Sequence, residues 1–404
     1  MKILWLSPIF PYPPFSGGQT RAYNLLKNLA KKNEITLFSF WRPNRIQGPV
    51  KEVEKFCSKV KTFKGRSIWS VRNFLLAGFS HLPFTITHFY GDRQVKIALQ
   101  KELENGKYDL IHFESFYTSP YLNTPGVQGS NTPGVSIPTV LGNENVEYLV
   151  YQRFVQRKIF PLKWLLSYDI WKMRRYEQAA WRKANLNLAV SEVDARVIEK
   201  IIQKKCVVIP NGVDIKHFEN FKPNRQRSGI TLLFVGDFKY FTNQNAVNFL
   251  VKKIWPKIKN QISKASLKLV GRNPNSLITN LAGNGVQINS QIDDIRQAYA
   301  SADILVAPMR IASGTNIKIL EAMAAGLPVV TTSIGIEGIR AKKGKEVIIA
   351  NQPDNFASEV IALASNKKRQ QELSLAGKKL VEKLYDWPQI ARKLERAYQE
   401  LING

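Results

Sequence analysis

Short apolar runs alternate along the chain with segments of helical period. Residues 2–6 are almost wholly apolar and end at a proline-rich loop, whereas apolar residues from 19 to 31 recur at i, i+3, i+4, i+7 and i+8. The first pattern predicts a buried strand and the second an amphipathic helix. Further strands are predicted at residues 35–40, 109–113, 138–141, 186–190 and 207–209. Strands that alternate with helices favour parallel pairing in a doubly wound sheet.

The alternation stops after residue 209 and starts again at residue 230. Turn chemistry from Pro210 to Asp214 and a polar, basic stretch with Pro223 indicate a linker. Later strands are predicted at residues 230–235, 266–270, 286–288, 304–307, 329–332 and 347–350. We therefore expect an α/β protein with two Rossmann-like, doubly wound domains that face a central cleft. The expected parts are an N-terminal domain at 1–208, a linker at 209–228, a C-terminal domain at 229–384, and a helical segment at 385–404 that packs back on the first domain.

Composition excludes several classes of protein. The 404 residues are 44% hydrophobic and 11% aromatic, which rules out a disordered or collagen-like chain. Two cysteines, Cys57 and Cys206, are too few for a disulfide-built scaffold, and no Cys/His cluster predicts a metal site. Prolines interrupt the first apolar run, so it does not read as a signal peptide, and no run is long enough to span a bilayer. We expect a cytoplasmic location, with peripheral binding to the inner face of the cell membrane.

The excess of positive charge needs a partner or another explanation. Lys and Arg number 59 against 31 Asp and Glu, a formal net charge of +28. Such a charge fits nucleic acid, an anionic membrane surface, a phosphorylated substrate, or simply a lysine-rich solvated surface. Since the basic residues are spread over the chain and no nucleic-acid-binding motif is present, we do not expect a nucleic-acid partner.

A first candidate ligand loop follows the first strand. Gly17 and Gly18 open the first predicted helix, where exposed N–H groups and the helix N-terminus favour an anion. Arg21 could add a charge-assisted contact. The alternative is an ordinary turn between a strand and a helix.

A second candidate loop follows the strand at 304–307. Ser313, Gly314 and Thr315 form a small-residue loop that opens a helix, and this arrangement can present free N–H groups to a diphosphate. The counter-charge would come from Arg310 and Lys318. Glu321 suits a diol such as ribose, because a carboxylate accepts two hydroxyl hydrogen bonds. The alternative is a helix that carries a solvent-exposed lysine and glutamate.

The segment from Gly314 to Val330 resembles the donor-binding segment of the retaining glycosyltransferases of family 4, which have the GT-B fold. Other pieces agree with that family in order, and together they cover nearly the whole chain. They are Gly17-Gly18, Val190-Ser191-Glu192, Pro210-Asn211-Gly212-Val213-Asp214, Phe234-Val235-Gly236, Leu269-Val270-Gly271 and Tyr385-Asp386-Trp387. The donor loop is similar to that of a branch with a Gly-Thr-Asn-x-Lys sequence.

The resemblance implies a nucleotide-sugar donor, a glycan or lipid-linked acceptor, and a role in surface polysaccharide or glycolipid synthesis. It also implies that no metal or cofactor is required, since basic side chains and helix dipoles neutralise the leaving diphosphate. Glu321 would take the ribose hydroxyls, and the loop at Gly17 and Gly18 would close over the donor phosphates. The donor-binding residues expected on this basis are Gly17, Gly18, Arg310, Ser313, Gly314, Thr315, Asn316, Lys318 and Glu321.

Two positions depart from the family pattern. Many members have a first glutamate eight positions before the second, and here that position is Ser313. Related sequences also often have a histidine where this chain has Glu144, so we assign no catalytic base there. The contact to the sugar is therefore less defined than the nucleotide site.

The remaining catalytic candidates are His112 and Glu114, at the end of the strand at 109–113. A histidine within a strand more often points into the core, so we expect Glu114, or Ser115, to face the cleft instead. Neither residue is assigned as catalytic, because retaining transfer does not need the paired carboxylates of a glycosidase: the donor diphosphate can take the acceptor proton.

Residues 151–183 combine basic and aromatic side chains. Nine Lys and Arg residues stand against Asp169 and Glu177, with Phe154, Trp164 and Trp171 among them. Such a helix suits an anionic membrane surface. The alternative is a helix pair that packs its aromatic residues inward.

The sequence thus predicts a retaining, metal-independent glycosyltransferase. A sugar-nucleotide epimerase of the same fold is an alternative, although it would need an acid/base set that the sequence does not clearly show. A non-catalytic nucleotide- or sugar-binding protein is a second alternative.

Overall fold

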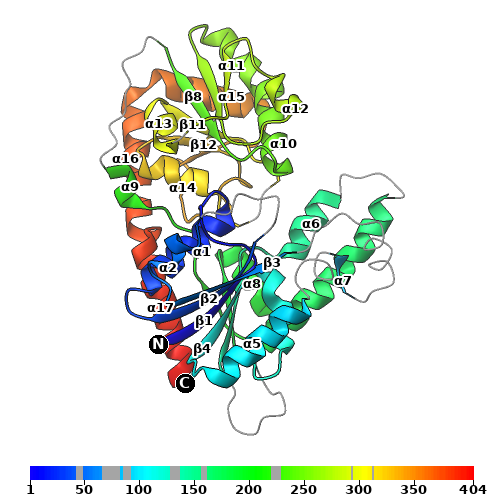
Figure 1. The fold of residues 1–404 in the computed structure, drawn as a ribbon. Helices are drawn as coiled ribbons and strands as arrows, with labels where there is room; N and C mark the ends of the chain where they lie inside the picture. The colour runs from blue at the N-terminus through cyan, green and yellow to red at the C-terminus, as the bar shows by residue number, and fades with distance from the viewer. Residues whose placement is uncertain are drawn as a thin grey trace. The chain divides into compact units, whose positions relative to one another are not determined.

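The computed structural model describes residues 1–41, 49–65, 82–84, 92–127, 137–155, 162–219, 229–292, 294–311 and 314–404. These residues form two compact units (Figure 1). The first unit contains Met1–Pro210 and Pro388–Gly404, and the second contains Asn211–Trp387. The final helix, α17 (Trp387–Asn403), therefore lies almost wholly in the first unit.

The first unit is built on a seven-stranded sheet of order β3-β2-β1-β4-β5-β6-β7, in which every pair of neighbours is parallel. Strands β1 and β4 are buried along nearly their whole length, as expected where helices cover both faces of a parallel sheet. The strands are β1 (Lys2–Ser7), β2 (Glu34–Trp41), β3 (Lys59–Lys64), β4 (Leu110–Glu114), β5 (Thr139–Asn143), β6 (Leu186–Ala189) and β7 (Cys206–Val208).

Helices α6 and α7 lie side by side in the first unit (Figure 1). The carboxylate of Glu177 on α7 accepts hydrogen bonds from the backbone N–H groups of Glu147 and Tyr148, which begin α6. The first-unit helices, besides α17, are α1 (Gly17–Leu29), α2 (Lys51–Glu54), α5 (Arg93–Asn105), the 3₁₀ helix η1 (Phe116–Asn123), α6 (Glu147–Val155), α7 (Leu162–Lys183) and α8 (Glu192–Ile202).

The second unit has a six-stranded parallel sheet of order β10-β9-β8-β11-β12-β13. Its strands are β8 (Thr231–Val235), β9 (Ser266–Val270), β10 (Val286–Asn289), β11 (Ile304–Ala307), β12 (Val329–Thr331) and β13 (Ile348–Ile349). Its helices are α9 (Ile215–Glu219), α10 (Phe241–Phe249), the π-helical turn η2 (Leu250–Ile254), α11 (Trp255–Gln261), α12 (Ser276–Thr279), α13 (Ile295–Ala300), α14 (Ile317–Ala324), α15 (Pro353–Ser365) and α16 (Lys367–Leu384).

Two doubly wound parallel sheets confirm the predicted fold class, and each predicted strand is present with its ends within two residues of the expected ones. Strand β3 was missed, because lysines occupy three of its six positions and leave no apolar run in this half-exposed strand at the sheet edge. In the segment predicted as a linker, Ile215–Glu219 form α9 of the second unit, and residues 220–228 lie outside the described part of the chain. Among the described residues, no helix has both the length and the hydropathy to cross a membrane.

Candidate functional site

The predicted diphosphate loop connects the end of β11 to α14 in the second unit. Gly314 has a φ of +66°, in the left-handed region that favours glycine. The backbone of Gly338 packs closely against the same loop, because a Cβ on Gly338 would lie 3.2 Å from Thr315 Oγ1. Asn316 Nδ2 donates a hydrogen bond of 2.7 Å to the carbonyl oxygen of Gly335. Thr315 is only 8% exposed, and its Oγ1 has no hydrogen-bond partner among the described residues. A buried donor therefore stands unpaired beside the first turn of α14, where an anion is favoured.

Lys318 lies in the first turn of α14 and is held by residues of another part of the unit. Its Nζ donates a 2.7 Å hydrogen bond to Asn243 Oδ1 and lies 4.4 Å from the centroid of the Phe234 ring. Burial lowers the pKa of Lys318 to about 7, although the nearby Glu321 carboxylate acts in the opposite direction. A bound diphosphate would favour the charged form, so this amine is suited to meet phosphate oxygens.

Glu321 follows Lys318 by three residues, which places both side chains on the same side of α14. The Tyr299 hydroxyl donates a 2.7 Å hydrogen bond to Glu321 Oε2. Burial raises the pKa of Glu321 to about 6, while the Tyr299 hydrogen bond and the Lys318 charge oppose the rise. The carboxylate form therefore predominates above that pH and can accept hydrogen bonds from a diol.

Arg310 lies at the end of the segment that follows β11. Its Nε donates a 3.1 Å hydrogen bond to Asn245 Oδ1, and its guanidinium lies 4.4 Å from the Phe249 ring centroid. Both partners belong to α10, as does Asn243, so one helix helps to position both predicted cations. Ser313, also predicted to bind the donor, lies outside the described residues.

In the first unit, Gly17 and Gly18 are the first two residues of α1. A Cβ on Gly18 would lie 2.9 Å from both carboxylate oxygens of Glu144, so a larger residue here would require the Glu144 side chain to shift. Burial, with the charges of Glu114 and Glu147, raises the pKa of Glu144 to about 8, while Arg21 opposes the rise. The predicted phosphate loop thus faces a carboxyl group that ordinarily retains its proton at neutral pH.

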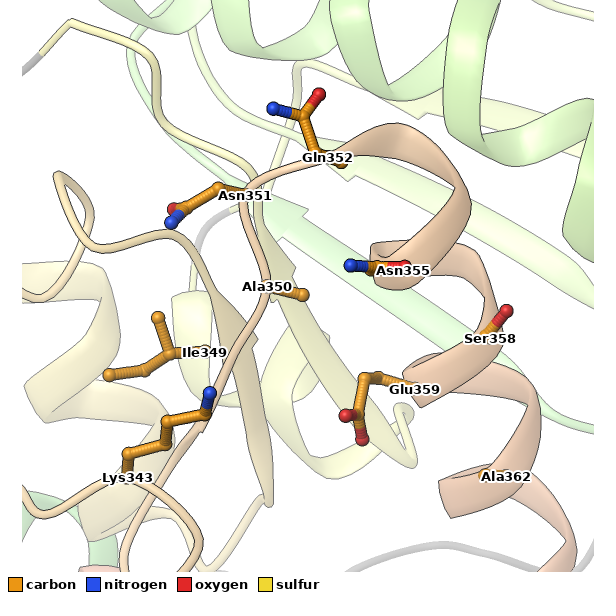
Figure 2. Close-up of a pocket in the computed structure, with 9 residues that line it drawn as sticks. All are labelled: Lys343, Ile349, Ala350, Asn351, Gln352, Asn355, Ser358, Glu359 and Ala362. Carbon is orange, nitrogen blue, oxygen red and sulfur yellow. The ribbon is translucent and has the colours of Figure 1, made fainter.

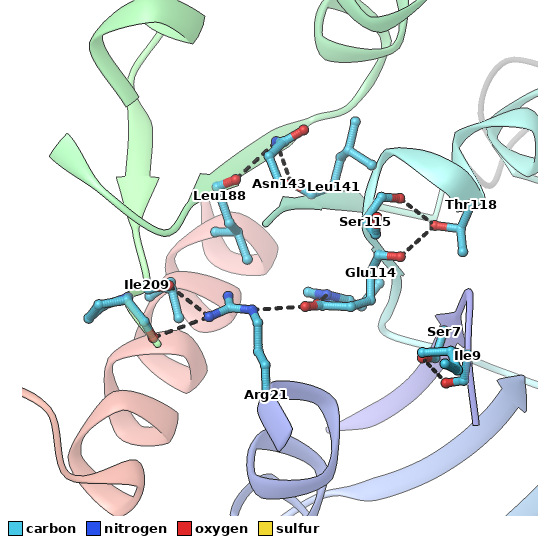
Figure 3. Close-up of polar contacts among 12 residues, drawn as sticks. Ser7, Ile9, Arg21, Glu114, Ser115, Thr118, Leu141, Asn143, Leu188 and Ile209 are labelled. Atoms are coloured by element: carbon cyan, nitrogen blue, oxygen red, sulfur yellow. Dashed lines mark hydrogen bonds and ion pairs between the residues drawn. The ribbon is translucent and has the colours of Figure 1, made fainter. Parts of the chain in front are cut away.

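The Arg21 side chain, which the sequence suggested as a ligand contact, is paired with other residues of the first unit. It is buried, and its Nε donates a 2.8 Å hydrogen bond to the Glu114 carboxylate (Figure 3). Its Nη1 donates to the carbonyl oxygens of Ile209 and Pro210, the last two residues of the first unit before the chain leaves it. The guanidinium group thus binds protein groups in the interior of the first unit.

His112 is fully buried, which confirms the expectation that it points into the core. Glu114 is fully buried as well, and Ser115 is only 3% exposed, so the structure does not leave either of them open to solvent. His112 stacks on Trp5 at 3.7 Å, and its ring nitrogens lie 2.6 Å from Glu114 Oε2 and 2.6 Å from the Tyr398 hydroxyl. Burial lowers the pKa of His112. Burial would raise the pKa of Glu114, but Arg21 and His112 outweigh it and hold that pKa below its usual value.

The sequence did not indicate four side chains that lie against the predicted site residues, namely Asn243, Tyr299, Asn245 and Glu144. Tyr299 is a buried residue of the short helix α13, and Asn243 lies in the first turn of α10. Glu144 was noticed only as a departure from the family pattern. No local signal marks the first two, because their partners are distant in sequence.

A cavity of about 590 Å³ lies elsewhere on the second unit, against β13 and α15 (Figure 2). Its lining includes Lys343, Asn351, Asn355 and Glu359, and none of the predicted donor-binding residues. Among the described residues, no three His, Cys, Asp or Glu side chains gather closely enough to hold a metal ion.

Two family models match the chain. One, described as Glycosyltransferase Family 4, matches residues 15–217, and the other, described as Glycosyl transferases group 1, matches residues 229–366. The phosphatidyl-myo-inositol mannosyltransferase of Mycobacterium leprae is 28% identical over 54% of this chain and 59% of its own length. The chain thus matches about three-fifths of that relative.

Solved structures of similar fold cover the whole chain. Sucrose-phosphate synthase from Thermosynechococcus elongatus matches with a TM-score of 0.72 and 17% identity, covering 100% of this chain and 99% of its own. HepE from Anabaena, in complex with UDP and glucose, matches with a TM-score of 0.65 and 16% identity, covering 99% and 100%. These likenesses show the two-unit fold.

Proposed function

Because the chain belongs to glycosyltransferase family 4, we propose that it is a retaining glycosyltransferase that moves a sugar from a nucleoside-diphosphate sugar to a glycan or lipid-linked acceptor. Its place would be in surface polysaccharide or glycolipid synthesis. The observation that carries the proposal is the position of Lys318 and Glu321 on the same side of α14, near the buried Thr315 hydroxyl, which has no hydrogen-bond partner among the described residues.

Each group of this arrangement suits one part of a nucleotide-sugar. The hydroxyl of Thr315, the first-turn N–H groups of α14 and the amine of Lys318 are donors that match a diphosphate. The Glu321 carboxylate matches the ribose hydroxyls, since it accepts more than one hydrogen bond. With Arg310 nearby, the same groups can stabilise the charge on the departing diphosphate without a metal ion.

Retention follows if the leaving diphosphate serves as the base. The acceptor oxygen forms its bond to the anomeric carbon on the face from which the phosphate oxygen departs, and the acceptor proton passes to that oxygen. The protein then contributes position and charge stabilisation rather than a nucleophile. Two names support the substrate classes: HepE was solved with UDP and glucose, and the mycobacterial relative is a mannosyltransferase for phosphatidyl-myo-inositol.

Slow hydrolysis of the donor in the absence of acceptor tests the proposal. The protein would be incubated with UDP-, GDP- and other nucleotide-sugars, and the released nucleoside diphosphate and the anomer of the first-formed product would be measured. We expect one donor class to be consumed, with retained configuration, and the same rate in EDTA. Release of the opposite anomer, or loss of activity in EDTA that Mn²⁺ restores, would contradict the retaining or the metal-independent part.

The exposed face of α7 supports the further proposal of a peripheral site on the inner face of the cell membrane. Trp164, Tyr168 and Trp171 are 69%, 50% and 50% exposed and recur at i, i+4 and i+7 of the helix. The Arg175 guanidinium lies 4.9 Å from the Trp171 ring centroid. Aromatic residues flanked by cations suit the headgroup region of an anionic bilayer. Residues 156–161 of the predicted segment lie outside the described part of the chain.

Co-flotation with liposomes measures this binding. We expect the protein to float with vesicles that contain phosphatidylglycerol at low salt. The double variant Trp164→Ala/Trp171→Ala should lose at least about three-quarters of the bound fraction, because each indole that inserts into the bilayer contributes apolar area to binding. Leu277→Ala and Leu375→Ala, which remove exposed apolar side chains of the second unit, are matched controls and should float normally. Equal flotation of all variants would contradict the role of α7.

A further inference from the structure

Only one oxygen of the Glu321 carboxylate is engaged by the protein. Oε2 accepts the 2.7 Å hydrogen bond from the Tyr299 hydroxyl, and no partner of Oε1 is found within the described residues. Glu321 retains part of its surface accessible, whereas Tyr299 is fully buried. Tyr299 therefore cannot meet a ligand itself, but it can fix the direction in which the free oxygen points.

The ring of Tyr299 is itself held in place by its packing. It contacts Phe218 of α9 edge to face, with centroids 5.8 Å apart and the two planes at 77°. Its own helix, α13, is capped by Asp294, whose carboxylate accepts a hydrogen bond from the backbone N–H of Arg296. Because the ring is fully buried, close packing favours a single position of its hydroxyl relative to α14.

The direction of the hydrogen bond between Tyr299 and Glu321 is also fixed. Burial and the Glu321 carboxylate raise the pKa of Tyr299 well above its ordinary value, so the hydroxyl stays protonated and acts as the donor. A fixed donor holds the carboxylate of Glu321 in its ionised form and in one orientation. Such pre-organisation reduces the entropy that a ligand must otherwise lose from the glutamate side chain.

We infer that Tyr299 is the positioning residue of the ribose site: it orients the Glu321 carboxylate so that the free oxygen accepts the ribose hydroxyls, and thereby sets the preference for ribonucleotide over deoxyribonucleotide donors. The inference rests on the proposed function, since it assumes a nucleotide at α14. It adds a residue from a different helix, 22 positions away, whose hydroxyl lies 2.7 Å from Glu321 Oε2 and 3.4 Å from the carbonyl oxygen of Lys318.

A comparison of ribose and deoxyribose ligands tests the inference. Isothermal titration would measure the affinity of the wild type, Tyr299→Phe and Tyr385→Phe for UDP or GDP, whichever the wild type binds, and for its 2′,3′-dideoxy counterpart. We expect the wild type to prefer the ribose form by at least about tenfold. In Tyr299→Phe the preference should fall below about threefold, through weaker binding of the ribose form and unchanged binding of the dideoxy form.

Tyr385→Phe is the matched control, because it removes a buried hydroxyl of the same unit that accepts a 2.7 Å hydrogen bond from the Arg340 N–H. It should keep the wild-type preference. Phe218→Leu, which loosens the Tyr299 ring without removing the hydroxyl, should lower the preference in the same direction and serves if Tyr299→Phe folds poorly.

A wild-type preference in a folded Tyr299→Phe protein, or in Phe218→Leu where that is the variant that folds, would overturn the inference while leaving the proposed function intact. Failure of the wild type to bind any nucleoside diphosphate would instead overturn the proposed function, and this inference with it.

Discussion

Replacing Glu321 with alanine will weaken binding of the nucleotide-sugar about 10- to 100-fold, the range expected when a ligand loses hydrogen bonds to a charged group. The variant removes the carboxylate that Tyr299 holds at 2.7 Å on α14, and with it the predicted acceptor for the ribose hydroxyls. Isothermal titration with the donor that the wild type hydrolyses measures the effect. Glu321→Gln keeps the size of the side chain and should lie between the two.

The pH dependence of that affinity separates the two charged groups of α14. Because the folded pKa of Glu321 is raised to about 6, the carboxylate is lost as the pH falls through that value. Because the pKa of Lys318 is lowered to about 7, the cation of the unliganded protein is lost as the pH rises through that value. Affinity should therefore peak between the two, and the diphosphate diester of a nucleotide-sugar does not itself titrate in this range.

In Glu321→Ala the fall at low pH should disappear and the fall at high pH should remain. Lys318→Gln, which removes the cation but keeps a polar side chain, should show the converse. An unchanged dissociation constant in Glu321→Ala, or an acid limb that persists in it, would exclude Glu321 from the ribose site.

The local part of this site follows from sequence alone. The apolar strand at 304–307, the small-residue loop and the helical period after it are properties of neighbouring residues, and they place Lys318 and Glu321 on one side of α14. The partners of these two side chains do not follow in that way. Asn243 lies 75 positions from Lys318, and only the pairing of β8 with β11 brings their segments together.

In the first unit, the predicted difference in burial between His112 and Glu114 was wrong for a physical reason. His112 and Glu114 are two positions apart on β4, and residues with that spacing point to the same face of a strand. Strand periodicity therefore predicts the same degree of burial for both side chains. The counter-charge that a buried Glu114 carboxylate needs comes from Arg21, which lies 93 positions away in the sequence.

Replacing Arg21 with alanine should destabilise the first unit by about 3–5 kcal/mol, the cost of removing one partner of a buried ion pair. The side chains of Arg21 and Glu114 are only 2% and 1% exposed, so the carboxylate would be left without its counter-ion or access to water. The carbonyl oxygens of Ile209 and Pro210 would lose their donor as well. Urea unfolding, with hydrogen exchange of the β4 and α1 amides to localise the change, measures the loss.

A double variant and a pH series test whether the unpaired Glu114 carboxylate causes the loss of stability. Arg21→Ala/Glu114→Gln should be more stable than Arg21→Ala at pH 7, because it has no buried carboxylate without a counter-ion.

In the wild type the pKa of Glu114 is lowered, so its ion pair contributes stability above the ordinary glutamate pKa of about 4.3. This contribution is lost as the pH falls through the pKa of the folded state. In Arg21→Ala burial is no longer opposed by the guanidinium, the folded pKa should be raised, and the penalty should be relieved on acidification. The stabilities of wild type and variant should therefore converge as the pH falls toward 4, and a constant difference across this range would show that lost packing, rather than the stranded carboxylate, causes the effect.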